Sequence, residues 1–222
     1  MFKSILYKEW IKIRLVVLIS LGLSLLALIN IFLKVRHDIL FVDAANYWYS
    51  FLFRGATYFG ILKFLPFAVG LGVAIAQYIP ETVNKRIKLT FHLPVSENGI
   101  LLRMHAFGSA VLLALFMSVL VLFTAGSAIF FPLNIIGASL ITMAPWFLGG
   151  LATYFLMALI LLEPVWLFRG LYTVVAAGFV TVFYAGAAIG AFRPVLLPLT
   201  ILILLLSIVV LFSGYRFRKG EM

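Results

Sequence analysis

The sequence contains no cysteine, which excludes a disulfide framework, a thiolate nucleophile and a sulfur-ligated metal site. Charge is also scarce: 11% of the 222 residues are Asp, Glu, Lys or Arg, against about 25% in a typical soluble domain. Hydrophobic residues make up 65% of the chain, more than a soluble fold of this size could bury. We therefore predict an integral membrane protein, with residues 1–222 forming a single transmembrane domain.

Residue patterns for catalysis are missing as well. His37, His92 and His105 show no metal-ligand spacing, and we interpret each as a surface or interfacial polar residue. The chain has no Gly-x-Ser-x-Gly elbow, and Ser127 has no evident histidine partner. It also lacks a phosphate-binding Gly-x-x-x-x-Gly-Lys-Ser/Thr loop, so any ATP used would be bound by another chain. We predict no metal site, no cofactor in this chain and no enzymatic activity of its own.

Long apolar segments are what the chain does have. A spanning helix takes about 20 such residues, and we predict an all-α fold with six transmembrane helices. The predicted spans are about 15–33, 57–79, 104–124, 137–162, 170–190 and 194–212. Pro145 and the pair Gly149-Gly150 could break the fourth span. Gly186 and Gly190 form a Gly-x-x-x-Gly pattern in the fifth, which weakly indicates close helix packing.

The basic residues that give the chain its net charge of +10 cluster at the ends of these segments. About twelve basic residues fall on the side of the two termini and about five on the other, and the basic side of a membrane protein faces the cytoplasm. We therefore predict cytoplasmic termini, with membrane lipid rather than nucleic acid as a partner. None of the seven acids lies in the middle of a predicted span, which argues against an ion-coupled pump.

The first 14 residues are amphipathic. Apolar residues recur at helical spacing on one face, while Lys3, Lys8 and Lys12 fall elsewhere. The apolar face consists of Phe2, Ile5, Leu6, Trp10 and Ile13. We predict a helix over residues 1–14 that lies in the cytoplasmic membrane surface. The alternative is a basic tail that only orients the first span.

Residues 34–54 form the longest predicted outer loop. It carries Tyr47, Trp48, Tyr49 and Phe51, and aromatic rings with polar tips favour the headgroup zone of a bilayer. We interpret this loop as an aromatic belt, with a ligand site as the alternative.

Residues 80–103 form the one strongly polar loop, between the second and third predicted spans. Pro80 can occupy the first turn of a new helix, which the Leu93-Pro94 pair would end. Glu81 and Lys85 stand four apart in the favourable order, and Ser96 can cap the next helix. The pattern predicts a short helix at the membrane surface. A basic loop that binds anionic lipid is the alternative.

This loop resembles the cytoplasmic loop of type-2 ATP-binding-cassette (ABC) exporter permeases. The likeness lies in an acid, a basic cluster and a Leu93-Pro94-Val95-Ser96 corner, and the start Phe2–Trp10 is similar to that family's interfacial helix. The resemblance implies a coupling helix over Glu81–Leu89 that docks a cytoplasmic ATPase subunit, which binds ATP and Mg. The docking residues that it implies are Glu81, Lys85, Arg86, Lys88, Leu89 and Pro94.

The resemblance further implies a homodimer or pseudo-dimer in a plasma (inner) membrane, with a substrate path lined by the first, second and fifth spans. The family's re-entrant hairpin between the last two spans has little room here, because residues 190–198 are few. Apolar span interiors favour a hydrophobic or amphipathic cargo. Two alternatives remain open: a non-catalytic scaffold subunit, and the substrate-binding membrane subunit of a vitamin-type importer, which would need an outward-facing polar pocket.

Overall fold

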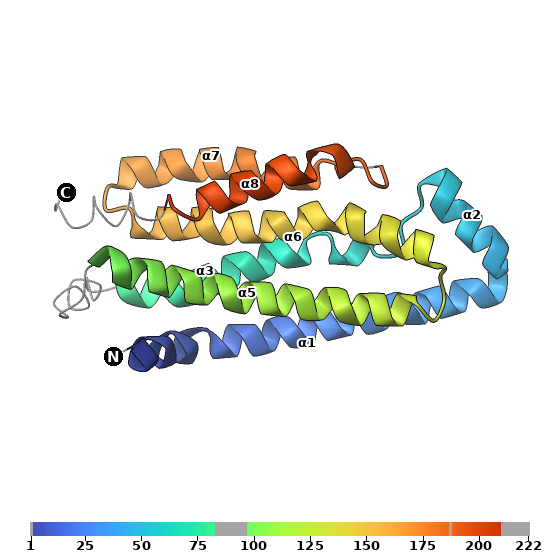
Figure 1. Cartoon of the computed structure of the whole chain (residues 1–222), viewed down its shortest axis with the longest axis horizontal. Helices are drawn as coiled ribbons and strands as arrows, with labels where there is room; N and C mark the ends of the chain where they lie inside the picture. The colour runs from blue at the N-terminus through green and yellow to red at the C-terminus, as the bar shows by residue number, and fades with distance from the viewer. Residues whose placement is uncertain (1, 83–96, 187, 210–222) are drawn as a thin grey trace.

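A computed structural model describes residues 2–82, 97–186 and 188–209, and these parts form helices, turns and short connections without strands. The helices are α1 (Phe2–Val42), α2 (Ala44–Arg54), α3 (Leu65–Thr82), α5 (Glu97–Ser127), α6 (Leu133–Leu162), α7 (Trp166–Tyr184) and α8 (Leu196–Leu206). Two short 3₁₀ helices, η1 (Gly60–Leu62) and η3 (Arg193–Val195), precede α3 and α8. The long helices run side by side in one bundle (Figure 1).

Helix α6 is the centre of this bundle. Helices α3, α5, α7 and α8 all pack on it, and α1 packs against α3 and α5. Of its apolar stretch 78% is buried, against at most 39% in the other long helices, so α6 has protein on most sides while its neighbours expose apolar faces. Such outward apolar faces are what a bilayer solvates.

Small residues allow the central contact. A Cβ on Gly70 of α3 would lie 2.1 Å from the backbone oxygen of Gly150 in α6, so the two backbones touch where both lack a side chain. Pro145 and Gly149-Gly150 do not break α6, which is continuous from Leu133 to Leu162. Gly186 and Gly190 lie beyond the end of α7, so the packing role predicted for them in a spanning helix is wrong.

In the described part of the chain, five helices are long and apolar enough to cross a membrane: Leu6–Phe41, Gly60–Thr82, Gly99–Ser127, Leu133–Leu162 and Trp166–Tyr184. They overlap the first five predicted spans and identify a multi-pass membrane protein. The sixth predicted span begins in η3, continues through the short apolar helix α8, and ends among residues 210–222, outside the described part. A sixth crossing therefore stays a prediction.

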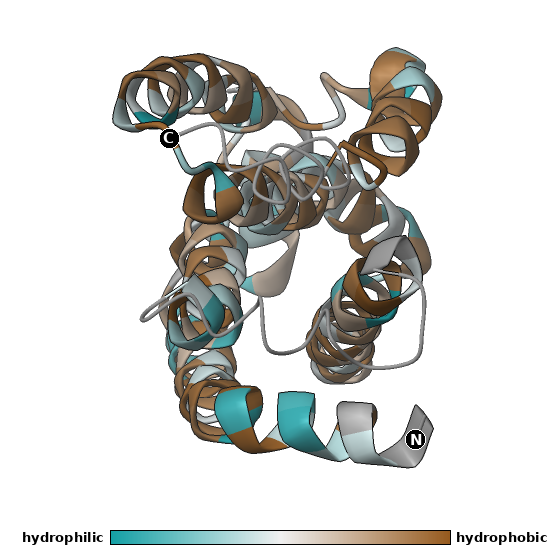
Figure 2. Ribbon diagram, turned by 90° about the vertical axis from the view of Figure 1, so that its left-hand side faces the viewer, coloured by the Kyte–Doolittle hydropathy of each residue, from teal (hydrophilic) through white to brown (hydrophobic). Residues whose placement is uncertain are grey.

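The predicted loop 34–54 is mostly helical. Helix α1 continues to Val42, Asp43 turns the chain with a left-handed φ of 73°, and α2 follows. The predicted helix 1–14 is likewise the first part of α1 rather than a separate element. Figure 2, which looks along the bundle, shows these first turns running across its end.

The bundle thus has two distinct ends. The starts of α1, α5 and α7 and the ends of α3 and α6 lie at one, which we call the N-terminal end (Figure 1, left). Helix α2, the end of α5 and the start of α6 lie at the other, which we call the α2 end.

Candidate functional site

Four charged side chains meet at the N-terminal end and form what we call the ion-pair cluster: Lys8, Glu9, Lys12 and Glu81. The Lys12 ammonium contacts the Glu9 carboxylate and lies 2.6 Å from Oε1 of Glu81, while Lys8 lies 2.7 Å from that same oxygen. Glu9 is 0% exposed and Glu81 2%. Counted over the described residues, two acids and two bases balance here, as buried charges must be paired.

The cluster joins parts of the chain that are far apart in sequence. Glu9 and Lys12 stand in the first turns of α1, and Glu81 is the second-last residue of α3. The crossing part of α1 is thereby fixed to the point where the chain enters residues 83–96.

A neutral hydrogen-bond network extends the cluster into the bundle; we call Gln77, Tyr78, His105 and Tyr154 the tyrosine network. The Gln77 amide nitrogen donates to Oε2 of Glu9 at 3.0 Å and to the backbone oxygen of Met104 at 2.7 Å. Tyr154 donates its hydroxyl to Oε1 of Gln77 at 2.7 Å. The Tyr78 hydroxyl lies 2.8 Å from Nδ1 of His105 and 3.4 Å from the Tyr154 hydroxyl.

Gly108 of α5 makes room for this network. A Cβ there would lie 2.1 Å from the Tyr154 hydroxyl and 2.2 Å from Oε1 of Gln77. Both distances are far below van der Waals contact, so only glycine allows α5 to pass these two groups at this distance.

His105 overturns one of our sequence interpretations. It is 3% exposed and packed between Tyr154 and Phe155, not at a surface. Its Nε2 has no hydrogen-bonding partner within the described ranges. His37 is exposed as expected, next to Asp38, and His92 lies outside the described residues. Among the described residues no cluster of His, Asp and Glu could hold a metal ion.

The predicted docking residues divide into two groups. Lys85, Arg86, Lys88, Leu89 and Pro94 lie outside the described residues. Glu81 is described, and its carboxylate is engaged by Lys8 and Lys12 inside the chain. Helix α3 also continues through Pro80 to Thr82, so Pro80 does not begin a new helix. A docking role for Glu81 stays a prediction, and its observed contacts hold α1 in place.

Only part of the apolar face predicted for residues 1–14 points outward in the structure. Ile13 is buried and Leu6 half-buried, but Trp10 is 41% exposed while the polar Glu9 points inward. Tyr7 and Ile11 are exposed beside Trp10, which gives the outer side of this part an apolar surface. The side chains of Phe2 and Ile5 lie outside the described part.

The α2 end carries a second, smaller polar site. A cavity of about 260 Å³ is lined there by Asn30, Ile31, Lys34, Asp38, Tyr47, Thr57, Tyr58, Gly60 and Ile61. Burial and the neighbouring Asp38 carboxylate raise the pKa of Tyr47 to about 12, and burial raises the pKa of Tyr58. Both phenols therefore stay neutral at physiological pH.

The aromatic belt predicted for residues 34–54 is only partly outside. Tyr49 is exposed, but Phe51 is buried and Tyr47 and Trp48 pack on the core. The indole of Trp48 donates to the backbone oxygen of Phe130 at 3.2 Å, which ties α2 to the bundle.

Comparisons of this chain with protein-family models, with curated proteins and with solved structures found no match.

Sequence reasoning missed the tyrosine network. A signal for it was present, because Gln77, Tyr78 and Tyr154 interrupt otherwise apolar segments, where a polar group must find a partner within the protein. Which groups pair could not be inferred, since Gln77 and Tyr154 are 77 residues apart.

Proposed function

We propose that this protein is the membrane subunit of an ABC exporter, moving a hydrophobic or amphipathic substrate with ATP hydrolysed by a separate cytoplasmic subunit. The observation that carries the proposal is the sequence of residues 80–96, in which an acid, a basic cluster and a Leu-Pro-Val-Ser corner stand between two membrane-length helices. The chain would act as a homodimer or pseudo-dimer in a plasma membrane, with its termini cytoplasmic.

The ion-pair cluster supports this proposal mechanically. A soluble ATPase that pushes on residues 83–96 pushes on the end of α3, and Glu81 there is held by Lys8 and Lys12 of α1. Movement of the loop would then displace α1 and α3 together. Because the packed bundle is nearly incompressible, that displacement would tilt these two helices rather than be absorbed locally.

The test is co-purification of the chain from its native membrane. A triple charge reversal of Lys85, Arg86 and Lys88 to Glu should remove a soluble ATPase that accompanies the wild-type protein. Three charges are changed together because single exposed pairs contribute only about 0–1 kcal/mol. The matched control reverses three exposed basic residues at the α2 end, Lys34, Arg36 and Arg54, and should leave the ATPase bound.

The outcomes separate the candidates. Loss of the ATPase with the first variant alone, in protein that is still correctly inserted, supports docking through this loop. An ATPase retained by both variants would contradict the coupling-helix assignment. Recovery of the wild-type chain without any ATPase, beside an intact control transporter, would favour a scaffold subunit.

The substrate-binding membrane subunit of a vitamin-type importer is a second candidate, and the polar cavity at the α2 end favours it. Such a subunit needs an outward polar pocket, and Asn30, Asp38 and Tyr58 contribute polar groups to this one. The cavity measures about 260 Å³, while small-molecule sites usually have about 300–1,000 Å³. We therefore rank the importer subunit below the exporter.

A further inference from the structure

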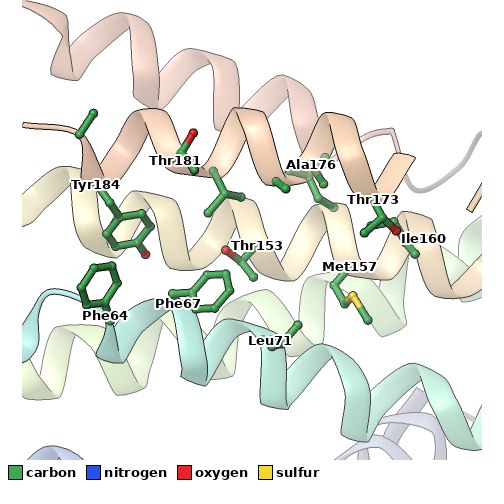
Figure 3. A pocket seen from close by; sticks show the side chains of 14 residues that line it. Phe64, Phe67, Leu71, Thr153, Met157, Ile160, Thr173, Ala176, Thr181 and Tyr184 are labelled. Atoms are coloured by element: carbon green, nitrogen blue, oxygen red, sulfur yellow. The ribbon is translucent and has the colours of Figure 1, made fainter. Parts of the chain in front are cut away.

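A long groove runs along the outside of the bundle between α3 and α7, with α6 as its floor (Figure 3). Its volume is about 610 Å³. Its lining includes Phe64, Thr153, Ile160, Thr173, Ala177 and Tyr184. All three helices are candidate membrane spans, so in a membrane this groove would lie at the depth of the hydrocarbon core.

The groove is apolar in spite of its threonines. The hydroxyls of Thr153, Thr173 and Thr181 each donate to a backbone oxygen three or four residues earlier in their own helix. Donors used in this way offer little to a ligand. The groove therefore suits a hydrocarbon and has no lining group that would select a polar molecule.

The two ends of the groove differ. At the α2 end the rings of Phe64 and Tyr184 stack with centroids 5.7 Å apart, and the Tyr184 hydroxyl donates to the backbone oxygen of Trp146. These contacts hold the two rings in place, so they close the groove at this end. Toward the N-terminal end the lining finishes at Ile160 and Thr173, which lie at the opposite side of Figure 3 from that pair.

One turn beyond Thr173 stands Arg169, on the same face of α7 because residues four apart on a helix share a face. Its guanidinium is half-buried, donates to the backbone oxygens of Glu163 and Leu161, and lies 5.0 Å from the Trp166 ring centroid. Trp and Arg at the start of a spanning helix are typical of the headgroup zone. A fixed positive charge therefore stands at the open end of the groove.

The length of the groove suits an extended acyl chain. From Thr173 to Ala185 the lining of α7 extends over about 18 Å at 1.5 Å per residue. A second helix could pack over this groove only by inserting side chains into it, whereas a single extended acyl chain can lie along its whole length.

We propose that this groove binds one acyl chain of an anionic phospholipid, whose phosphate pairs with Arg169. Hydrocarbon surroundings give no hydrophobic drive for this binding, because lipid tails are as apolar as the groove. The acyl chain is retained because it makes close van der Waals contacts that an unfilled groove would lack. The anionic headgroup is selected by the positive charge at the end of the groove. The groove lies between the second and fifth spans, which the exporter resemblance places along the substrate path, so crosslinks from it to a second copy would count for that path and against this site.

The experiment reconstitutes the protein in phosphatidylcholine vesicles that contain phosphatidylglycerol with a photoreactive diazirine in one acyl chain. Irradiation should label groove residues of α6 and α7, with mass spectrometry locating the label. The same probe on a phosphatidylcholine headgroup should label the groove about fivefold less, since a basic residue near the surface contributes about 1 kcal/mol to binding an anionic lipid. Arg169→Gln should abolish that preference while some labelling remains.

A variant that fills the groove completes the test. Ala177 lines the groove and is exposed, so Ala177→Phe adds a ring there without displacing the core, and it should remove groove labelling by both lipids. The matched control is Ala114→Phe on the exposed side of α5, which should change nothing. Labelling that is uniform over all outward faces, or indifferent to Ala177→Phe, would overturn the proposal. So would crosslinks from the groove to a second copy of the chain.

Discussion

The two ends of the bundle are held together by different chemistry. At the N-terminal end α1 is fixed by buried charges, with the ammonium of Lys12 between the carboxylates of Glu9 and Glu81. At the α2 end the main contacts are aromatic: the Tyr58 ring stacks on Phe131 at 4.4 Å and on Phe123 at 5.8 Å. One end depends on a few specific partners, and the other on many similar contacts.

This difference predicts different responses to mutation. Removing one member of a buried ion pair leaves an uncompensated charge, whereas removing one polar atom from an aromatic cluster leaves its ring contacts in place. A rigid, specific joint at the N-terminal end also suits the proposed function, because force from an ATPase would enter there.

The largest effect is expected from Lys12→Met. Among the described residues, loss of this ammonium leaves the buried Glu9 carboxylate with the Gln77 amide as its remaining donor, and it also takes one base from Glu81, which should cost about 3–5 kcal/mol. The free energy of unfolding in detergent micelles measures it. The matched control, Lys34→Met, removes an exposed lysine from the same helix at the α2 end and should cost about 0.5 kcal/mol or less.

A second variant tests whether the lost stability comes from the uncompensated charge rather than from the changed side chain itself. Lys12→Met combined with Glu9→Gln removes one charge of each sign and should recover much of the lost stability. If Lys12→Met were no more harmful than Lys34→Met, the ion-pair cluster would not hold the N-terminal end.

The positions of the second to fifth spans could be predicted because an apolar run of about 20 residues has few other uses. The length of α1 was missed, because Lys34, Arg36, His37 and Asp38 resemble a loop. The better signal was that residues 23–54 contain neither glycine nor proline, so nothing in them stops a helix. Helix α7, by contrast, ends at Tyr184, before the predicted end of the fifth span, and Gly186 is the glycine that follows this helix end.

The candidate site could be predicted only in part. Local spacing indicated that Glu81 and the lysines near the N-terminus lie on helices, but Lys12 and Glu81 are 69 residues apart in the chain. Spacing along a helix carries no information about such a contact, which depends on how α1 crosses the end of the bundle. The same reason hid the burial of His105.

A smaller effect is expected from Gly108→Ala, which tests how closely α5 approaches the tyrosine network at the N-terminal end. The new methyl group would overlap the Tyr154 hydroxyl and Oε1 of Gln77 and separate them, at a cost of about 1–3 kcal/mol. Gly22→Ala in α1 is the control, because nothing lies within 4 Å of its added Cβ, and it should gain up to about 1 kcal/mol. Adding Tyr154→Phe to Gly108→Ala should relieve part of the strain. Equal unfolding free energies for the two glycine variants would contradict the close approach of α5 to the tyrosine network.

The smallest effect belongs to the α2 end. Tyr58→Phe removes a hydroxyl that lies 3.1 Å from Oγ of Ser139 and 3.4 Å from Oγ of Ser127, but it keeps the ring. Ser139 keeps another partner, since it already donates to the backbone oxygen of Ile135. The loss should therefore be about 1 kcal/mol, the usual net contribution of one hydrogen bond, and Tyr49→Phe at an exposed position should cost less still. A loss from Tyr58→Phe as large as that from Lys12→Met would mean that the α2 end also depends on a specific polar partner. The contrast between the two ends would then fail, and the polar cavity beside Tyr58 would gain weight as the functional site.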